Sequence, residues 1–248
     1  VATAMVDEGA ARSEAEARIM TLDSRGLIVE GRPNLPPGKQ KLALSLDAVK
    51  DWQIEDHPIG LRDVVRNARA SVLIGVSGEP GIFTEEMIRR MALHAERPII
   101  MPLSNPTSHA EVTPAGAIEW TDGRALVATG SPFPEVRYDG RSHVIGQANN
   151  VFVFPGMGLG VLAVGARRVS DRMFLAASKA LADSVDREMV EKGQLYPSIS
   201  DVRATSALVA KAVAHQAVAE GLAAPSVDID RRIDEEMWFP EYLPYRAV

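Results

Sequence analysis

The sequence predicts an α/β protein, with a doubly wound, mostly parallel sheet followed by C-terminal helices. Between residues 71 and 131, short apolar runs alternate with helical segments in the order β-α-β-α-β, joined by short connections. Beyond Gly146 this alternation ends, and two long alanine-rich amphipathic segments follow with no strong strand between them. The length of 248 residues permits one large domain or two smaller ones.

The first 70 residues predict helices, one short strand and an exposed connection. Residues 1–10 are an alanine-rich helix, and a second helix begins at the N-cap candidate Ser13. The chain then enters a strand that ends at Asp23, followed by a turn. Residues 32–45 are rich in proline, glycine and lysine, which predicts an exposed connection, and a helix follows in LRDVVRNA.

The alternating region begins with the strand SVLIGVS and the turn GEPG. Thr84 then opens a helix with glutamates in its first turn and arginines further on, which is the charge order that a helix dipole favours. The later predicted elements are the strand RPIIMPLS, the helix TPAGAIEWT, the strand RALVATGS, and helices in VSDRMFLAASKALADSV and DVRATSALVAKAVAHQAVAEGLA. The proline-broken end, with Trp238, Phe239, Tyr242 and Tyr245, predicts a docking arm.

Composition excludes several classes of function. Hydrophobic residues make up 46% and charged residues 24%, as in an ordinary globular protein. The net charge of -6 argues against a nucleic-acid partner, which requires a basic face. The uncharged run Val151 to Ala166 is shorter than the ~20 residues of a bilayer span and contains Pro155, so we expect no membrane segment.

The residues that usually carry metal or hydrolytic chemistry are absent or wrongly spaced. There is no cysteine, which rules out disulfides and thiolate metal sites. The five histidines lack metal-ligand spacing, and no G-x-S-x-G motif is present. The sequence therefore predicts no metal site and no hydrolase triad within this chain.

Asp23 has two interpretations. In a dinucleotide-binding fold, an acidic residue at the end of a strand accepts hydrogen bonds from the adenosine ribose, whereas elsewhere it caps a helix or turn. In the β-α-β context, the ribose contact and the cap are about equally good explanations of Asp23. Arg25, Lys39 and Lys41 would instead neutralise a 2′-phosphate, so the choice between NAD and NADP stays open.

Two groups of amides and one small-residue loop follow predicted strands, where parallel sheets bind ligands. Residues 75–81, GVSGEPG, form a loop that would let a ligand approach the backbone, although an ordinary turn explains them nearly as well. Asn105, Asn149 and Asn150 offer donors and acceptors without charge, which suits a small hydroxy acid or keto acid. A single asparagine is usually a turn or cap, but two groups at strand ends favour ligand contact.

The segment GLGVLA, residues 158–163, matches the pattern G-x-G-x-x-A of a phosphate-binding loop. Pro155 interrupts the junction before it, and no acidic strand end lies at the expected distance. We therefore interpret these glycines as the packing face of a helix.

Long stretches of this chain resemble the C-terminal half of malic enzyme, in particular bacterial members of the large-subunit type. The resemblance rests on DSRGLIVEGR, IGVSGEPGIFTEEMI, RPIIMPLSNPTSHAE, GRALVATGSPF and GQANNVFVFPGMGLGVLAVGARRVSDRMFLAAS, with a tail like MWFPEY. It covers nearly the whole chain. It implies a Rossmann-like domain and the oxidation of (S)-malate by NAD or NADP, followed by decarboxylation to pyruvate.

The resemblance also implies roles for individual residues. Asp23 would contact the adenosine ribose with support from Arg32, and the loop of Val76, Ser77 and Gly78 would border the cofactor. Asn105 and Asn149 would hydrogen-bond malate and the nicotinamide side of the site, with Asn150 beside them.

The same resemblance implies that the catalytic acid and base, the carboxylates that bind Mg²⁺ or Mn²⁺, and the first strand with its glycine-rich loop precede Val1. Residues 1–149 would be the NAD(P)-binding domain, 150–220 helices that pack with an absent substrate domain, and 221–248 a C-terminal arm. We expect the chain alone to be inactive, and the full protein to be a cytoplasmic homo-oligomer, either a dimer or a tetramer.

Two other classes of function remain open at this level. One is a non-catalytic nucleotide-binding or assembly module whose amides are purely structural. The other is a dehydrogenase of the same fold that acts on a different hydroxy acid.

Overall fold

The computed structural model describes residues 1–55, 57–225 and 228–239. The chain divides into two compact units, each described separately below. The first comprises Val1–Ala148 and Glu188–Leu195, and the second Asn149–Arg187 and Tyr196–Val248. The functional division at residues 149 and 220 stays a prediction.

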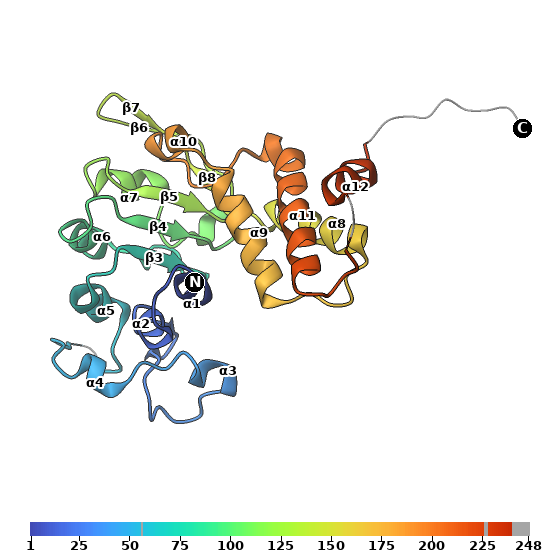
Figure 1. Cartoon of the computed structure of the whole chain (residues 1–248). Helices are drawn as coiled ribbons and strands as arrows, with labels where there is room; N and C mark the ends of the chain where they lie inside the picture. Colours follow the sequence, from blue (N-terminus) through green and yellow to red (C-terminus); the bar gives the residue numbers. More distant parts are fainter. Residues whose placement is uncertain (56, 226–227, 240–248) are drawn as a thin grey trace, which may run out of the picture. The chain divides into compact units, whose positions relative to one another are not determined.

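A four-stranded parallel sheet forms the centre of the first unit (Figure 1). Its strands lie in the order β3 (Val72–Gly75), β4 (Ile99–Pro102), β5 (Leu126–Thr129) and β8 (Gly146–Gln147). Helices α6 (Glu85–Ala92) and α7 (Pro114–Glu119) make the connections from β3 to β4 and from β4 to β5. The predicted α/β class and its β-α-β-α-β order are confirmed.

Helix ends and side-chain burial explain why these elements form. The Thr84 hydroxyl caps α6 by accepting from Met87 N at 3.5 Å, and the Thr113 hydroxyl caps α7. Ile88 and Ile118, one from each helix, pack into one core with apolar side chains of the strands, namely Leu73, Ile100 and Val127. On β3, the alternate residues Val72 and Ile74 are exposed.

The beginning of the first unit lies outside the parallel sheet. Its elements are α1 (Ala2–Asp7), α2 (Arg12–Ala17), β1 (Leu22–Asp23), β2 (Gly26–Leu27), α3 (Pro37–Gln40), α4 (Leu46–Val49) and α5 (Leu61–Ala68). The predicted N-cap at Ser13 is wrong, because α2 already begins at Arg12 and Ala11 occupies the cap. The predicted strand at Asp23 exists, but β1 pairs antiparallel with β2 in a hairpin of its own.

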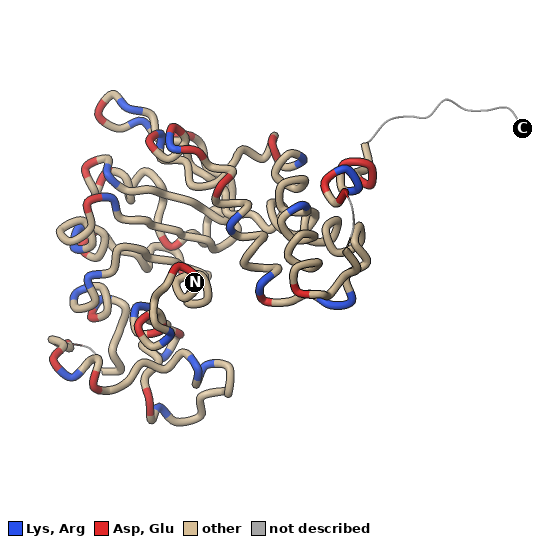
Figure 2. Tube along the Cα trace, in the orientation of Figure 1, with Lys and Arg blue, Asp and Glu red and all other residues tan. Residues whose placement is uncertain are grey.

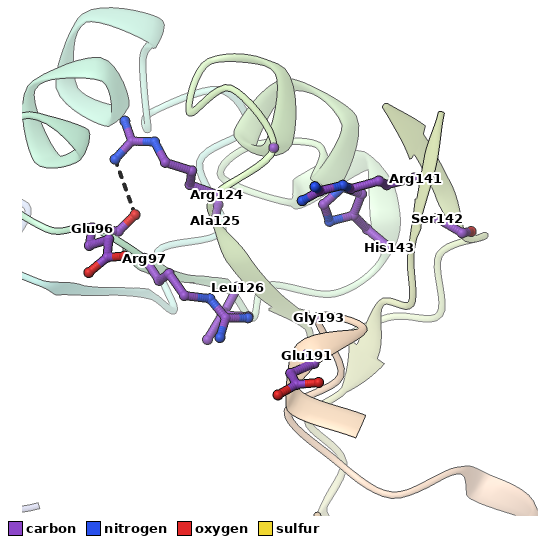
Figure 3. Close-up of a pocket in the computed structure, with 11 residues that line it drawn as sticks. Glu96, Arg97, Arg124, Ala125, Leu126, Arg141, Ser142, His143, Glu191 and Gly193 are labelled. Atoms are coloured by element: carbon purple, nitrogen blue, oxygen red, sulfur yellow. Dashed lines mark hydrogen bonds between the residues drawn. The ribbon is translucent and has the colours of Figure 1, made fainter. Parts of the chain in front are cut away.

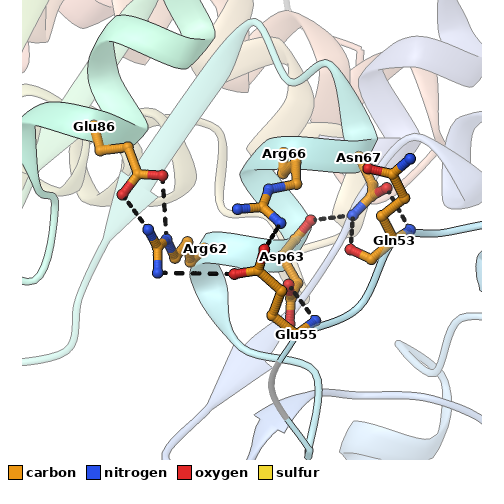
Figure 4. Close-up of polar contacts among 7 residues, drawn as sticks. All are labelled: Gln53, Glu55, Arg62, Asp63, Arg66, Asn67 and Glu86. Carbon is orange, nitrogen blue, oxygen red and sulfur yellow. Dashed lines mark hydrogen bonds and ion pairs between the residues drawn. The ribbon is translucent and has the colours of Figure 1, made fainter.

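A polar network fixes the segment before α5 (Figure 4). Arg62 on α5 donates to Glu86 on α6 at 2.6 Å, and Arg66 pairs with Glu55. Asp63 is fully buried and accepts from the backbone N of Glu55 at 3.0 Å. The buried carboxylate thus satisfies a loop N–H, while the exposed ion pairs mainly orient the neighbouring helix.

A second hairpin, which the sequence analysis did not predict, lies between β5 and β8. It consists of β6 (Val136–Tyr138) and β7 (Arg141–His143). Most of α10 (Arg187–Glu191) and the residues after it also belong to this unit. Val144 N donates to Lys192 O at 3.0 Å, which holds that returning segment beside the hairpin.

The second unit is helical among its described residues. It contains η2 (Asn150–Phe152), α8 (Phe154–Val164), α9 (Asp171–Asp183), η3 (Ile199–Asp201), α11 (Val202–Ala219) and α12 (Ile229–Glu236). Helix α8 carries no charged residue, as its uniform tan trace in Figure 2 shows. Its side chains share a core with Met173 of α9, Val213 of α11 and Ile233 of α12.

Glycines bring α8 and α11 into direct contact. A Cβ at Gly156 would lie 2.5 Å from Ser206 O, and one at Gly160 would lie 2.5 Å from Ala210 O. Gly158, in contrast, faces open space. The GLGVLA segment lies within a packed helix, as predicted. Of its two glycines, Gly160 lies on the packing face, whereas Gly158 does not, and the second contact glycine is Gly156, before the segment.

The segment after α11 packs onto its own unit. Leu222 and Ala223 are buried in the helical core. Arg203 donates to Trp238 O at 2.5 Å, and its guanidinium lies 4.4 Å from the ring centre of Phe239. The remaining aromatic residues of the predicted arm, Tyr242 and Tyr245, lie outside the described residues. No helix that the structure describes is long and apolar enough to cross a bilayer.

Candidate functional site

The carboxyl ends of β3, β4 and β5 meet at one edge of the first unit's sheet, because the strands are parallel. The loop Val76 to Gly78 follows β3, and Asn105 follows β4. The sequence analysis selected both, and the fold places them at the same edge. Val76 has 78% of its surface exposed, so its side chain is available to a ligand.

A buried carboxylate anchors the loop after β3. Glu111 is fully buried and accepts from Ser77 N at 2.8 Å and from Ser77 Oγ at 2.9 Å. It also accepts from Ser104 Oγ at 2.5 Å, and His109 Nδ1 lies 3.0 Å from Gly78 O. Burial raises the pKa of Glu111, but the hydrogen bonds from Ser104 and Ser77 outweigh it and leave that pKa below its usual value.

Asn105 is exposed, and a hydrogen bond to its side-chain oxygen fixes its carboxamide. Its Oδ1 accepts from Ser131 Oγ, a side chain at the end of β5. Its Nδ2 donates to no other described residue, so two N–H donors remain for a ligand. The backbones come close here, because a Cβ at Gly130 would lie 2.1 Å from Leu103 O. Only glycine allows the two strand ends to bring Asn105 and Ser131 together.

Asn149 and Asn150 begin the second unit and are described within it. Asn149 caps η2 through its Oδ1, which accepts from Val151 N at 3.0 Å. The structural interpretation of this asparagine as a cap is thus correct for its oxygen, while its Nδ2 makes no bond to a described residue. Asn150 is exposed and its side chain makes no hydrogen bond to a described residue.

Asp23 holds two cations in the N-terminal part of the first unit. Its two carboxylate oxygens accept from Arg32 Nη2 and Lys39 Nζ, each at 2.5 Å, and Arg25 N donates to Oδ1 at 3.0 Å. Arg32 also donates to Gly26 O at 3.1 Å. Lys39 first, and then Arg32, hold the pKa of Asp23 well below its usual range. Arg32 thus contacts Asp23 directly, and the role of this pair at the adenosine ribose stays a prediction.

A hollow of about 310 Å³ lies at the other edge of the sheet, where β4 and β5 begin (Figure 3). Arg97, Leu126, Arg141, His143 and Glu191 are among its lining residues. His143 Nε2 is buried without a hydrogen-bond partner among the described residues. Arg124 also lines it but is already bound to the carbonyls of Ala92, Ala95 and Glu96. None of the residues predicted for the site contributes to this hollow.

Four residues that hold the predicted site residues in place were not predicted from the sequence: Ser104, Glu111, Gly130 and Ser131. A serine or a lone glutamate in a loop usually faces water, so their residue types carried no signal. The available signal was position, because Ser104 and Ser131 follow β4 and β5 as Ser77 follows β3. Among the described residues, no group of three or more His, Cys, Asp or Glu side chains is arranged to hold a metal ion.

A parallel α/β unit with a polar, glycine-lined carboxyl edge and an acidic residue in the preceding segment is typical of nucleotide-binding domains. The family model described as malic enzyme, NAD binding domain, matches residues 1–218. The chain therefore belongs to the malic enzyme family.

Individual relatives agree. The chain is 47% identical to the NAD-dependent malic enzyme of Sodalis glossinidius and 48% identical to that of Acinetobacter baylyi, over 98% of its own length. It spans only 44% of each of these relatives. Its fold is similar to the crystal structure of Entamoeba histolytica malic enzyme, with a TM-score of 0.67 and 25% identity over 94% of this chain and 44% of that one.

A second solved structure gives the same result. The malic enzyme from Pyrococcus horikoshii aligns with a TM-score of 0.60 and 28% identity, covering 85% of this chain and 43% of that one. The resemblance to the C-terminal half of malic enzyme, which was predicted from the motifs, is confirmed.

Proposed function

We propose that this chain is the C-terminal, cofactor-binding part of an enzyme that oxidises (S)-malate and decarboxylates the product to pyruvate and CO2. The observation that carries the proposal is the arrangement of Asn105. Ser131 fixes its carboxamide oxygen, which leaves the NH2 group to donate at the carboxyl edge of the sheet. A fixed NH2 donor suits the carboxylate or C2 oxygen of malate and orients it without adding charge.

The other predicted residues keep the roles that the resemblance implies, each within its own unit. Asn149 has the same form, with a bonded oxygen and an available NH2 group, and we assign it to substrate and nicotinamide contact with Asn150 beside it. Val76, Ser77 and Gly78 border the cofactor, with the exposed Val76 side chain offering an apolar surface. When bound, the nicotinamide supplies the acceptor for the hydride from malate C2.

We propose NAD as the cofactor rather than NADP. The relatives named above are described as NAD-dependent. An acidic side chain suits a ribose diol, and it repels the 2′-phosphate of NADP. Both Asp23 oxygens bind cations here, so we propose that a ribose hydroxyl replaces Lys39, whose side chain is 42% exposed.

The proposed reaction also needs a divalent metal to polarise the C2 oxygen. The described residues of this chain do not form a suitable ligand group, so no step is assigned to them. From the resemblance, we propose that Mg²⁺ or Mn²⁺, together with the catalytic acid and base, is held by the remainder of the protein. We propose homo-oligomeric assembly on the same basis.

The role of Asn105 can be tested by replacing it in the complete protein that contains these residues. Asn105→Ala should raise the KM for malate by about 10-fold or more, because a donor to a charged ligand is lost. Asn105→Asp should raise it further, because a carboxylate would repel malate. Initial-rate kinetics with malate, NAD and Mn²⁺ measure both effects.

Ser108→Ala, at an exposed neighbour in the same turn, is the control and should leave the KM unchanged. A wild-type protein that does not turn over malate would rule out the proposed activity. Unchanged malate kinetics in both Asn105 variants would reject only the role of this residue.

A further inference from the structure

Glu111 is a buried carboxylate that interacts with two loops and, among the described residues, with no cation. Buried charges are normally paired with an opposite charge, because removing them from water costs several kcal/mol. Here the compensation consists of donors from two places in the chain. They are the backbone N–H and hydroxyl of Ser77, after β3, and those of Ser104, after β4. One carboxylate thus ties together the ends of two adjacent strands.

The two serine hydroxyls extend this interaction to further backbone groups. Ser77 Oγ accepts from Glu79 N at 3.1 Å, and Ser104 Oγ accepts from Gly78 N at 2.9 Å. The N–H groups of Ser77, Gly78 and Glu79 are therefore all bound to Glu111, directly or through one hydroxyl. In an anion-binding loop, consecutive N–H groups point outward to the ligand, whereas here an internal anion occupies them.

The end of β3 is shaped to accept this side chain. A Cβ at Gly75 would lie 2.5 Å from Glu111 Cδ and 2.7 Å from Phe83 Cζ. Any side chain at position 75 would therefore displace Glu111 from the loops that it binds. Gly75, Glu111 and the two serines form one structural unit, which we call the carboxylate anchor.

We propose that Glu111 is a positioning residue that holds the cofactor-bordering loop and the Asn105 turn in their binding arrangement before any ligand arrives. This inference rests on the function proposed above and specifies how its site is kept in shape. Preorganisation of this kind lowers the conformational entropy lost on binding, so its removal weakens binding.

The experiment compares Glu111→Gln with Thr121→Val in the complete protein. Gln keeps the shape of the side chain but replaces one acceptor oxygen with a donor. Thr121 is an equally buried polar residue at the end of α7, where its hydroxyl donates to Ala117 O and accepts from Ala125 N. Thr121→Val therefore removes buried hydrogen bonds without changing the anchor.

We expect Glu111→Gln to raise the KM for NAD by about tenfold, with a smaller change in kcat, since it removes charge-assisted bonds that order the loop. Amide hydrogen exchange of residues 77–79 and 104 should become faster in the same variant. Thr121→Val should change neither the KM for NAD nor the exchange rates, even if it lowers the Tm as much as Glu111→Gln does. Ser104→Ala, which keeps the carboxylate, is the second variant if Glu111→Gln does not fold, and should accelerate exchange at Gly78.

Unchanged KM and unchanged exchange in the anchor variants would overturn the inference, as would an equal rise of the KM in Thr121→Val. If the wild-type protein does not oxidise malate, the proposed function fails. Hydrogen exchange still decides whether Glu111 orders the two loops, so the two failures can be told apart.

Discussion

Among single residues, His143 has the clearest dependence on pH. Burial first, and then the charge of Arg141, lower its pKa below the usual value of 6.5. The unfolded chain therefore binds more protons than the folded one once the pH falls below about 6.5, and folding stability decreases with it. Protonation would also place a charge on Nε2, which is buried without a partner among the described residues.

We therefore predict that His143→Gln flattens the loss of Tm between about pH 7.5 and pH 5.5, since Gln does not titrate. Differential scanning calorimetry at several pH values measures this. His94→Gln, at an exposed histidine after α6, is the control and should keep the wild-type slope. Parallel curves for His143→Gln and the wild type would contradict the prediction.

Asp23 changes stability in the same direction as His143, but at lower pH. Its pKa is lowered by Lys39 and Arg32, so its contribution to stability is present above the unfolded value of about 4 and is lost as the pH falls below it. Replacing Asp23 would also leave Arg32 and Lys39 without their carboxylate partner, and two unpaired cations attract a phosphate.

We predict that Asp23→Ser lowers kcat/KM for NAD by about tenfold and raises it for NADP. The ratio of the two values, measured at saturating malate, is the readout. Adding Lys39→Ala should remove the gain with NADP. A ratio that does not move in Asp23→Ser would contradict the assignment of this residue to the ribose.

Residue types alone indicated part of the candidate site. Asparagines after strands and an acidic residue at a strand end carry chemistry that can be recognised in a sequence, whereas the role of Arg32 came only from the family resemblance. Glu111 could not be recognised in this way, because its role depends on Ser77, which lies 34 positions earlier in the chain. For Asn149 the sequence offered both a cap and a ligand contact, and only the structure showed that its oxygen is used as a cap.

Among the elements, α8 and α11 share the most extensive helix contact in the described part of the second unit. Their contact depends on Gly156 and Gly160, whose missing side chains let the backbones approach. The sequence predicted a packed helix here from its glycines and from Pro155. It could not identify the contact face, because that depends on which side of α8 meets α11.

We predict that Gly160→Ala lowers the free energy of unfolding by about 1–3 kcal/mol, because its methyl group would overlap Ala210 O. Gly158→Ala, two residues away on the open side, is the matched control. It should leave stability unchanged or raise it by up to about 1 kcal/mol through helix propensity. Urea unfolding measures the stability of both variants. Equal changes in Gly160→Ala and Gly158→Ala would show that the contact between α8 and α11 does not control stability.

For the whole molecule, the expected activity depends on how much of its relatives' length the chain spans. The chain spans 44% of the relatives that it matches, and the catalytic acid, base and metal ligands of the proposed reaction are assigned to the remainder. Asn105 and Asn149 are each proposed to contact the substrate, but neither side chain ionises to transfer a proton at neutral pH.

We therefore predict that the isolated 248-residue chain neither oxidises malate nor binds NAD tightly, because only part of the proposed site is present. Spectrophotometric assay of NADH formation with malate and Mn²⁺, and calorimetric titration with NAD, are the measurements. Turnover by the pure chain would contradict the assignment of the catalytic groups to other residues. The complete protein in the same assays is the positive control.

The sequence by itself determined the α/β class, the β-α-β-α-β order of residues 71–131 and the family, and it selected the amides of the candidate site. These follow from local patterns, since apolar runs, helix caps and motif residues are all readable within short windows. Only the tertiary structure decided that β1 pairs in its own hairpin, that Asp23 holds two cations, and that Glu111 anchors two loops. These features depend on contacts between residues far apart in the chain. A glutamate usually faces water, and only the fold shows that Glu111 is buried and binds two loops.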